Sequence, residues 1–406
     1  MSDISSSANR VSDDRTRRAG SGEPLNITRP SFDESEVENV RRCLQSGWVT
    51  QGPMTAEFER RFARRHAVRH ALATTSCTSA LHLATSALGL GAGDEVIVPA
   101  FTWVTSAHCA EYVGAKAVFA DIRTETFDLD PAAFEEAITS RTRAVVVVHL
   151  FGLAAEMDEI LMIAQQHNLA VIEDAACAVG AEYDGVPVGG LGDVGCFSFH
   201  PRKVVTTGEG GMVTTNRDDV NEAVKPLRNH GATPPDLPPR PYHMSRFDIL
   251  GYNLRLSDIQ AAVGLAQLDK LDGLLAERRR RAERYHELLA DVPDIACPTV
   301  PVKCGHTYQS YVVRMMEGGV HRRNGVMDAL AEAGVQTRPG THAVHRLGYY
   351  RDKYGWKPEQ FPNAVEAEDT TITLPVFPGM TDDQQDVVAD WLRSALSRPS
   401  SLRKAA

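Results

Sequence analysis

Between residues 95 and 200, short apolar runs alternate with helical segments, and this alternation constrains the fold more than any other feature of the chain. The apolar runs read EVIVPA, AKAVFADI, RAVVVVHLFG, LAVIEDAA and GCFSFH. The segment EMDEILMIAQQHN, between the third and fourth runs, places Met157, Ile160, Leu161 and Ala164 on one helical face. Strands that are apolar throughout and alternate with helices are typical of a parallel sheet covered on both faces. We therefore predict an α/β fold that binds its ligand at the carboxyl ends of the strands.

The length of 406 residues favours two or three domains, and the texture of the chain changes after about residue 265. The segment QLDKLDGLLAERRRRAERYHELLA predicts a long amphipathic helix, whose RRRR run we expect to form a solvated face. A smaller α/β unit follows, with strands SYVVRMM and TITLPVFP, the helix NGVMDALAEAG and a last helix from about Thr381. We predict a large domain over residues 24–265 and a small C-terminal domain over 266–398. The ends, residues 1–23 and 399–406, hold too few core residues to fold and are predicted to be disordered.

The charge, the cysteines and the apolar runs exclude several classes of function. A formal net charge of −10 argues against a sequence-independent grip on nucleic acid, which requires clustered Lys and Arg. The seven cysteines are scattered without a CxxC pair, which indicates free thiols in a reducing compartment rather than a disulfide frame or a metal site. The longest apolar run, AVVVVHLFGLAA, is too short for the roughly 20 residues of a membrane-spanning helix, and the N-terminus is polar. We expect a cytoplasmic protein that acts on small molecules, with neither nucleic acid nor membrane as a partner.

Two helices are expected early in the chain. Apolar residues including Val37 and Leu44 recur at helical spacing over 34–46. A second helix, SALHLATSALGLG, begins at Thr78 or Ser79 after the segment TTSCT. The free N–H groups and the dipole of a helix start favour an anion, and the hydroxyls of Thr78 and Ser79 add donors. Simple N-capping explains the same two residues.

Three further residues lie at or just beyond strand ends. Asp174 ends the apolar strand LAVIEDAA, so its carboxylate requires either a cationic partner or the edge of the sheet. It is a candidate for holding a protonated ring nitrogen, with a structural salt bridge as the alternative. Trp103, after VPAFT, offers a flat indole that stacks on a heteroaromatic ring or belongs to the core. Lys203, in SFHPRKVVTTGEGGMV, is either an ordinary loop lysine or a buried amine held for covalent chemistry.

These features are more specific together than apart. The sheet arrangement brings all of them to strand ends and helix starts. An anion cradle, a stacking ring, an acid for a pyridinium and an amine for a Schiff base are what pyridoxal 5′-phosphate (PLP) requires. The segments SGWVTQGPMTAEFERRFA, CTSALHLA, GDEVIVPAFTWVTSA, GYNLRLSDIQAA and TLPVFPGMT, with the block around Lys203, resemble the DegT/StrS-like aminotransferases over nearly the whole chain after the tail.

That resemblance implies a fold-type I PLP-dependent transferase, with a large mostly parallel domain and a smaller C-terminal α/β domain. It implies that Lys203 binds the cofactor as a Schiff base, that Asp174 pairs with the pyridinium nitrogen, and that Trp103 stacks on the ring. The phosphate would be held by Thr78, Ser79 and Ser198, and by Asn253 from the neighbouring subunit. A homodimer with active sites at the subunit interface follows.

The chain departs from the family pattern in three places. Cys177, in EDAACAVG, stands where Gln or His usually lies near the phenolic oxygen of the cofactor, where a thiol is a weak substitute. Cys77 replaces a common Gly, which is tolerated if the backbone does not need a positive φ. The segment TRPGTHAVH, residues 337–345, differs from the His-Tyr-then-Pro-His pattern of sugar-nucleotide members. An unusual carbonyl substrate is one consequence.

The resemblance implies a ping-pong Schiff-base aminotransferase that moves an amino group from L-glutamate or L-glutamine to a ketone on a sugar, expected to be nucleotide-linked. Alternatives are a cyclitol or non-sugar ketone of a secondary-metabolite pathway, and a non-catalytic PLP-binding regulator. Sugar dehydration is disfavoured because that branch replaces the lysine by histidine. Candidates for substrate contact, with hydrogen-bonded scaffolding or ion pairing as the alternative, are His200, His345, Arg255 and Arg228.

Overall fold

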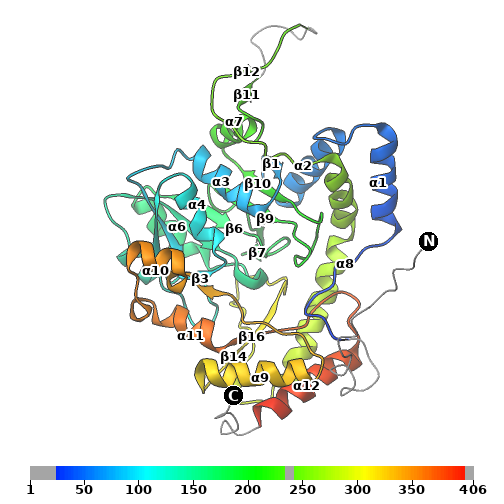
Figure 1. Cartoon of the computed structure of the whole chain (residues 1–406), viewed down its shortest axis with the longest axis vertical. Helices are drawn as coiled ribbons and strands as arrows, with labels where there is room; N and C mark the ends of the chain where they lie inside the picture. Colours follow the sequence, from blue (N-terminus) through cyan, green and yellow to red (C-terminus); the bar gives the residue numbers. More distant parts are fainter. Residues whose placement is uncertain (1–23, 234–241, 398–406) are drawn as a thin grey trace, which may run out of the picture.

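The computed structural model describes residues 24–233 and 242–397 (Figure 1). The disordered ends predicted at 1–23 and 399–406 lie outside the described residues. No helix within the described ranges is long and apolar enough to cross a membrane.

A seven-stranded sheet forms the centre of the described part of the chain. The strands β2, β4, β5, β6 and β9 run parallel, whereas β10 pairs antiparallel with both β9 and β1. The mostly parallel α/β sheet expected from the sequence is therefore confirmed. Its spatial order is β1 (His70–Thr74), β10 (Gly211–Thr215), β9 (Val194–Ser198), β6 (Ala170–Asp174), β5 (Thr142–Val148), β2 (Glu95–Pro99) and β4 (Lys116–Ala120).

Helices cover both faces of this sheet, because successive side chains of a strand point to opposite sides. Val145 and Val147 of β5 enter one apolar cluster and Val146 enters the other. The first cluster receives side chains from α2 (Pro53–Arg65), α5 (Pro131–Glu136), α6 (Met157–Gln166) and α8 (Asp258–Leu289), and the second from α3 (Cys77–Ala87), α4 (Thr105–Tyr112) and α7 (Asp218–Leu227). Both faces of the strands are thereby removed from water, which explains their uniformly apolar sequences.

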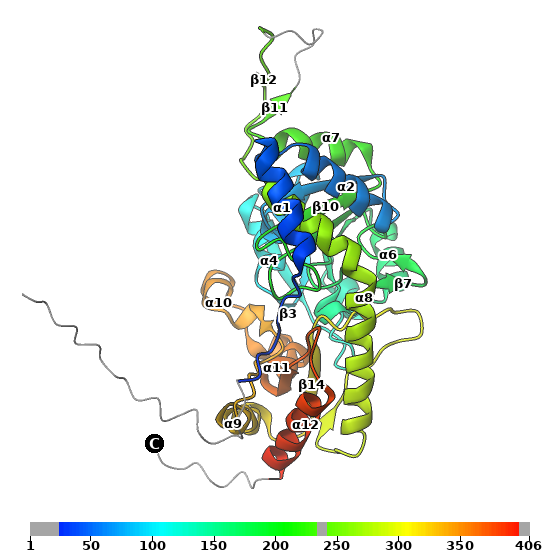
Figure 2. The same cartoon turned by 90° about the vertical axis from the view of Figure 1, so that its right-hand side faces the viewer.

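The long helix α8 connects this sheet to a second, smaller one (Figures 1 and 2). The first part of α8 packs on the large sheet, and Ala282, Tyr285 and Leu289 near its end join a third apolar cluster. The domain boundary predicted at residue 265 falls inside this continuous helix. The cluster is completed by the antiparallel strands β13 (Ile295–Ala296), β14 (Tyr311–Met315) and β16 (Thr371–Leu374), covered by α9 (Gly319–Glu332) and α12 (Asp382–Leu396).

The four-arginine run on α8 is not the solvated face that its charge suggested. Arg278 is 1% exposed, and its guanidinium donates to the carbonyls of Tyr308, Gln309 and Val376. Arg281, three residues later on the same side of the helix, is buried beside Gln385. Burial lowers the pKa of Arg278 to about 10. Helical spacing turns Arg278 and Arg281 inward and leaves the other two arginines of the run outward. The two inward arginines hold α8 against the segments around the small sheet.

The helix predicted over 34–46 is confirmed as α1 (Glu34–Ser46), but it packs differently from its apolar pattern. Glu36 and Cys43 face inward, whereas Val37 and Leu44 are about half exposed. The carboxylate of Glu36 is accommodated because Gln267 of α8 donates to it at 2.6 Å. The apolar stripe of α1 is thus left on the surface of this chain.

Two strands of the central sheet were not expected from the sequence, and one helix starts earlier than expected. The strands β1 (HALAT) and β10 (GMVTT) mix small and polar residues with a few apolar ones, so they carry a weaker strand signal than the continuous apolar runs. Helix α3 begins at Cys77, one residue before the earlier of the two expected starts. Ser76 is its N-cap, and its Oγ accepts a hydrogen bond from the backbone N–H of Ser79 at 3.1 Å.

Candidate active site

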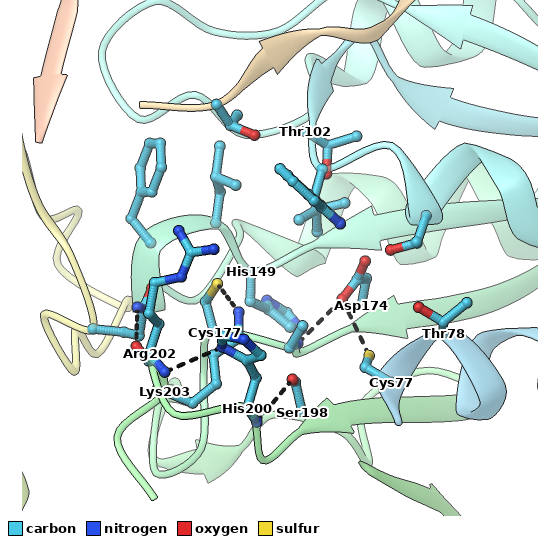
Figure 3. Close-up of a pocket in the computed structure, with 18 of the residues that line it drawn as sticks. Cys77, Thr78, Thr102, His149, Asp174, Cys177, Ser198, His200, Arg202 and Lys203 are labelled. Atoms are coloured by element: carbon cyan, nitrogen blue, oxygen red, sulfur yellow. Dashed lines mark hydrogen bonds between the residues drawn. The ribbon is translucent and has the colours of Figure 1, made fainter. Parts of the chain in front are cut away.

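A pocket opens at the carboxyl ends of β5, β6 and β9, beside the start of α3, where the sheet model places a ligand site (Figure 3). The pocket is lined by the end of β6 and the turn after it, by the loop after β9, and by the residues that follow β3 (Phe101–Thr102). The residues predicted from the sequence that line it are Thr78, Trp103, Asp174, Cys177, Ser198, His200 and Lys203. Separate strand ends have therefore brought most of the predicted site together.

Lys203 lies in a closed loop between β9 and β10. The backbone N–H of Phe199 donates to Gly210 at 2.9 Å and that of Thr207 donates to Phe199 at 3.0 Å, which closes the loop at its base. Val204, the next residue, is buried and anchors the loop. The half-buried Lys203 extends Nζ into the pocket, where it lies 3.1 Å from Sγ of Cys177 (Figure 3). The amine is thus held by the fold instead of extending into solvent as an ordinary loop lysine does.

Asp174 is 4% exposed and its carboxylate is oriented by fixed donors. Ser106 donates to Oδ2 at 2.6 Å and the backbone N–H of Ala176 donates to Oδ1 at 3.1 Å. The hydroxyl of Thr102 lies 2.9 Å from that of Ser106 and continues the chain. Neither partner is a cation, so the structural salt bridge considered for Asp174 is absent among the described residues. The carboxylate retains acceptor capacity toward the pocket.

The residue before Asp174 is a second buried carboxylate with a different environment. Glu173 is fully buried and accepts hydrogen bonds from the backbone N–H groups of Gly189, Leu191 and Gly192 at 2.6, 2.8 and 2.7 Å. His149 of the pocket wall adds a hydrogen bond of 3.0 Å from Nε2, because its Nδ1 accepts from Ala155. Burial acts to raise the pKa of Glu173, but these donors outweigh it and hold the pKa below its ordinary value.

Hydroxyl groups gather near the start of α3. Thr78 and Ser198 both line the pocket, with Ser198 at the end of β9 (Figure 3). A helix start supplies free backbone N–H groups and a favourable dipole for an anion. Cys77 adds a thiol 3.9 Å from Oδ1 of Asp174, and burial raises the pKa of this thiol well above its ordinary value. The site therefore offers neutral donors and backbone groups to a phosphate.

The segment 337–345, singled out for its unusual sequence, borders the same pocket. Its strand β15 (His342–Ala343) pairs antiparallel with β3, next to the half-exposed Trp103. The rings of Trp103 and His342 lie 5.7 Å apart between centroids. Gly340 and Thr341 line the pocket directly. This segment therefore contributes to the pocket wall, as expected for a region that selects the substrate.

Some predicted residues are not brought to the pocket of this chain. The hydroxyl of Ser79 lies 2.8 Å from that of Thr75 and does not line the pocket. Asn253 is exposed, and Arg255 donates to Asn229. The predicted substrate contact His345 is fully buried against Phe361, and burial lowers its pKa to about 4. Arg228 is ion-paired with Glu59 at 2.5 Å.

The structure also adds residues that the sequence did not single out. Ser106 is the second residue of α4, and nothing in the segment GDEVIVPAFTWVTSA marks it as the partner of Asp174. Gln309 and Arg338 line the pocket from segments beyond residue 300. Arg338 stands in the flagged TRPGTHAVH segment, so its neighbourhood carried a signal although the residue itself did not.

Comparison with known proteins establishes the family. The DegT/DnrJ/EryC1/StrS aminotransferase family matches residues 30–393. The chain belongs to this family. The resemblance identified in the sequence is confirmed, and so is the prediction of an aminotransferase. GDP-perosamine synthase from Caulobacter vibrioides is 43% identical over 328 residues, which cover 80% of this chain and 86% of that protein.

Solved structures agree with this assignment and with the fold-type I architecture. A putative sugar aminotransferase from Streptococcus pneumoniae, solved in its PMP form, matches with a TM-score of 0.88 and 28% identity. The match covers 92% of this chain and 99% of that one, and the same protein was also solved in a PLP form. A 3-amino-5-hydroxybenzoic acid synthase matches with a TM-score of 0.85 and 30% identity, over 93% of this chain and 100% of that one.

Proposed function

We propose that this protein transfers the amino group of L-glutamate or L-glutamine to a ketone on a nucleotide-linked sugar, with PLP as its cofactor. The observation that carries the proposal is the half-buried amine of Lys203, held at the same pocket as the carboxylate of Asp174 in a chain of this aminotransferase family. Relatives named for sugar amination, including GDP-perosamine synthase, support a nucleotide-linked ketone.

The residues of the pocket fit PLP. The deep carboxylate of Asp174 suits a protonated ring nitrogen, the half-exposed indole of Trp103 suits a ring face, and the hydroxyls of Thr78 and Ser198 beside α3 suit a phosphate. Cys177, beside Nζ of Lys203, is close to the reacting end. Bound there, PLP supplies a carbon that takes amines covalently and a ring that withdraws electrons.

Lys203 performs the proton transfers in this proposal. Its amine would hold the cofactor until the amino donor takes its place. The freed Nζ would then carry the proton from the α-carbon of the donor to the cofactor, and in the second half of the cycle it would carry a proton back to the carbon of the ketone. Lys203 rather than Arg202 suits this task, because an ammonium loses its proton far more readily than a guanidinium. Water would release the keto acid of the donor before the ketone is bound.

Asp174 holds the proton on the ring nitrogen. Ser106 and the backbone of Ala176 fix its carboxylate in place, so no reorganisation is needed when charge develops during the reaction. This positioning lets one carboxylate stabilise the positive charge that makes the ring an electron acceptor.

We further propose a homodimer with the active sites at the subunit interface. The strands β11 (Ala232–Thr233) and β12 (Arg246–Phe247) lie away from the main body at the top of Figure 1. Exposed apolar side chains such as Phe247 and Leu250 follow this region toward Asn253. Such a surface is suited to a second copy, from which Asn253 would reach the phosphate. Light scattering should give twice the chain mass; a monomeric active enzyme contradicts this proposal.

The central test is the lysine. The purified enzyme should show the visible absorption of a lysine-bound cofactor, and borohydride should fix the cofactor to the chain. Lys203→Ala should lose both, whereas Lys225→Ala, an exposed lysine paired with Glu222, should keep both. If Lys203→Ala keeps the borohydride-reducible absorption, the assignment is wrong.

Two further measurements separate the alternatives. Addition of L-glutamate should remove the visible band in an aminotransferase, and a non-catalytic regulator should keep it. The amine-loaded enzyme is then offered nucleotide-linked keto sugars, free keto sugars and keto cyclitols, and recovery of the band identifies the acceptor. The 3-amino-5-hydroxybenzoic acid synthase among the structural matches keeps a non-sugar ketone as the second candidate. The cytoplasmic location remains a prediction from the sequence.

A further inference from the structure

We infer that Arg338, Arg202 and Thr28 form a binding site for an oxyanion of the substrates, at the side of the pocket that faces the small sheet. This inference rests on the proposed function, because that function brings two such groups: the carboxylates of the amino donor and the phosphates of a nucleotide-linked ketone. Arg202 and Arg338 line the main pocket together with Lys203. They also line an adjoining smaller cavity, where Thr28 joins them.

Both guanidinium groups lack an anionic partner. Neither forms a side-chain hydrogen bond or an ion pair with any residue in the described ranges, and Glu209, which lines the same pocket, is not paired with them. Arg314 and Arg346, by contrast, are ion-paired at 2.7 Å with Glu366 and Glu368. Arg338 is partly buried, whereas Arg202 is exposed. A guanidinium that is partly withdrawn from water and left unpaired costs free energy, so Arg338 points to a ligand that completes it.

The two positive charges at this position, on Arg202 and Arg338, repel one another. Burial lowers the pKa of Arg338, and the neighbouring positive charge of Arg202 lowers it further. Two like charges held near each other, one of them partly buried, create a local excess of positive potential. An oxyanion between them relieves both the desolvation and the repulsion.

Each of the three residues is held by the fold. Arg202 precedes Lys203, and its carbonyl accepts a hydrogen bond of 2.7 Å from Nε2 of Gln309. The carbonyl of Arg338 accepts from the backbone N–H of Thr373 in β16 at 2.7 Å. Backbone hydrogen bonds of Leu25 with Gly334 and Gln336, at 2.8 and 2.9 Å, tie the segment carrying Thr28 to the chain before Arg338.

Thr28 supplies an independent indication. Its Oγ1 is a buried polar atom that has no hydrogen-bond partner among the described residues. Buried hydroxyls are normally satisfied, so an unpartnered one beside two unpaired guanidinium groups indicates a missing acceptor. A carboxylate or phosphate oxygen accepts from all three, and the planar guanidinium binds such groups through two parallel hydrogen bonds.

The position relative to Lys203 is suited to a substrate anion. Arg338 and Cys177 line the same pocket, and the sulfur of Cys177 is 3.1 Å from Nζ of Lys203. An anion bound by Arg338 therefore lies on the side of the pocket where the amine reacts. This arrangement serves to orient a substrate before proton transfer.

The test uses the PLP-loaded enzyme and two unreactive probes. Glutarate carries the two carboxylates of glutamate without its amine, and GDP carries the phosphates of a nucleotide sugar without its ketone. Calorimetric titrations compare the parent with Arg338→Gln, Arg202→Gln and Thr28→Val. Arg314→Gln is the matched control, since it removes a guanidinium from the same small sheet but outside the pocket.

We expect Arg338→Gln to weaken binding of one probe by tenfold or more, Arg202→Gln to weaken the same probe, and Thr28→Val to weaken it less. Arg338→Lys should restore part of the loss. A loss confined to glutarate assigns the site to the donor carboxylate, and a loss confined to GDP assigns it to phosphate. Visible cofactor absorption and an unchanged melting temperature show that each variant is folded.

The inference is overturned if the parent binds neither probe, or if Arg338→Gln binds both as the parent does. Failure of the proposed function has a different signature. In that case the parent binds a probe through Arg338, but no amino donor removes the visible band of the cofactor.

Discussion

The end of strand β6 places two carboxylates side by side in sequence and on opposite faces of the sheet, and their environments differ completely. Glu173 accepts hydrogen bonds from three backbone N–H groups and from His149. These bonds connect the end of β6 to the neighbouring segments of the chain. Asp174 faces the pocket and accepts from one hydroxyl, one backbone N–H and, at 3.9 Å, the weak thiol donor of Cys77. Both are almost removed from water.

The difference is the one expected between a structural carboxylate and the carboxylate proposed to bind the cofactor. Glu173 has its hydrogen-bonding capacity used within the fold, so its charge stabilises the chain and is hidden from any ligand. Asp174 is oriented but not saturated, so its remaining capacity is directed at what enters the pocket. Burial alone does not distinguish the two roles, because the number of fixed donors decides which role a buried carboxylate takes.

The largest expected effect is on turnover at Asp174. Asp174→Asn should lower kcat by about a thousandfold, roughly 4 kcal/mol in the barrier, because a neutral amide no longer holds the proton on the ring nitrogen. The melting temperature should change little, since no cationic partner is left unpaired. Single-turnover kinetics with L-glutamate measures the effect, and the exposed Asp184→Asn serves as control.

The distinction between Asp174 and Glu173 would be contradicted if Asp174→Asn lost stability in proportion to its loss of activity. Such a result would make Asp174 a structural residue of the same kind as Glu173.

For Glu173, on the other face of β6, we expect a loss of stability with little loss of turnover. Glu173→Gln should lower the free energy of unfolding by about 3 kcal/mol, because its amide nitrogen faces backbone donors that require an acceptor. Protein that remains folded should keep kcat within a few fold. Urea unfolding followed by circular dichroism gives the first quantity, and steady-state assays below the transition give the second. A thousandfold loss of kcat in folded protein would contradict the assignment.

The stability contributed by Glu173 should depend on pH. Its pKa is lowered in the folded chain, so the folded state binds fewer protons than the unfolded state as the pH approaches the ordinary pKa of about 4.3. The contribution is therefore complete above that pH and is lost as the pH falls through the lowered value. The stability difference between the parent and Glu173→Gln should shrink as the pH falls below the ordinary pKa of about 4.3. A difference independent of pH would show that charge is not its source.

The smallest effect should come from the partner of Asp174. Ser106→Ala removes the hydrogen bond of 2.6 Å and should lower kcat about tenfold with little change in KM for the donor. Ser106→Thr keeps the hydroxyl and should recover most of the rate. Because a purely structural role would not produce this rescue, the pair tests whether Ser106 positions the carboxylate. Equal activity of Ser106→Ala and the parent would remove Ser106 from the proposal.

The local sequence was sufficient for Asp174, Lys203 and Trp103, because strand ends in a parallel sheet converge whatever the details of packing. It was insufficient for His345 and for the arginine run on α8. His345 is fully buried against Phe361, and Arg278 is buried against carbonyls more than 30 residues away, so neither environment exists in the neighbouring sequence. The packing of α1 was not predictable for a related reason. The apolar spacing of Val37 and Leu44 predicts a helix but does not show which part of the protein packs against it.

The sequence by itself determined the α/β class, the strands β14 and β16 and the helices α9 and α12 of the small unit, and the family, because periodicity and motifs are local properties that survive any arrangement of the chain. Only the tertiary structure decided which of two adjacent carboxylates faces the pocket. It also decided that Ser106 orients Asp174, and that Thr28, Arg202 and Arg338 converge from three distant segments. The physical reason is that burial and hydrogen-bond satisfaction are set by neighbours in space, and folding alone assigns those neighbours.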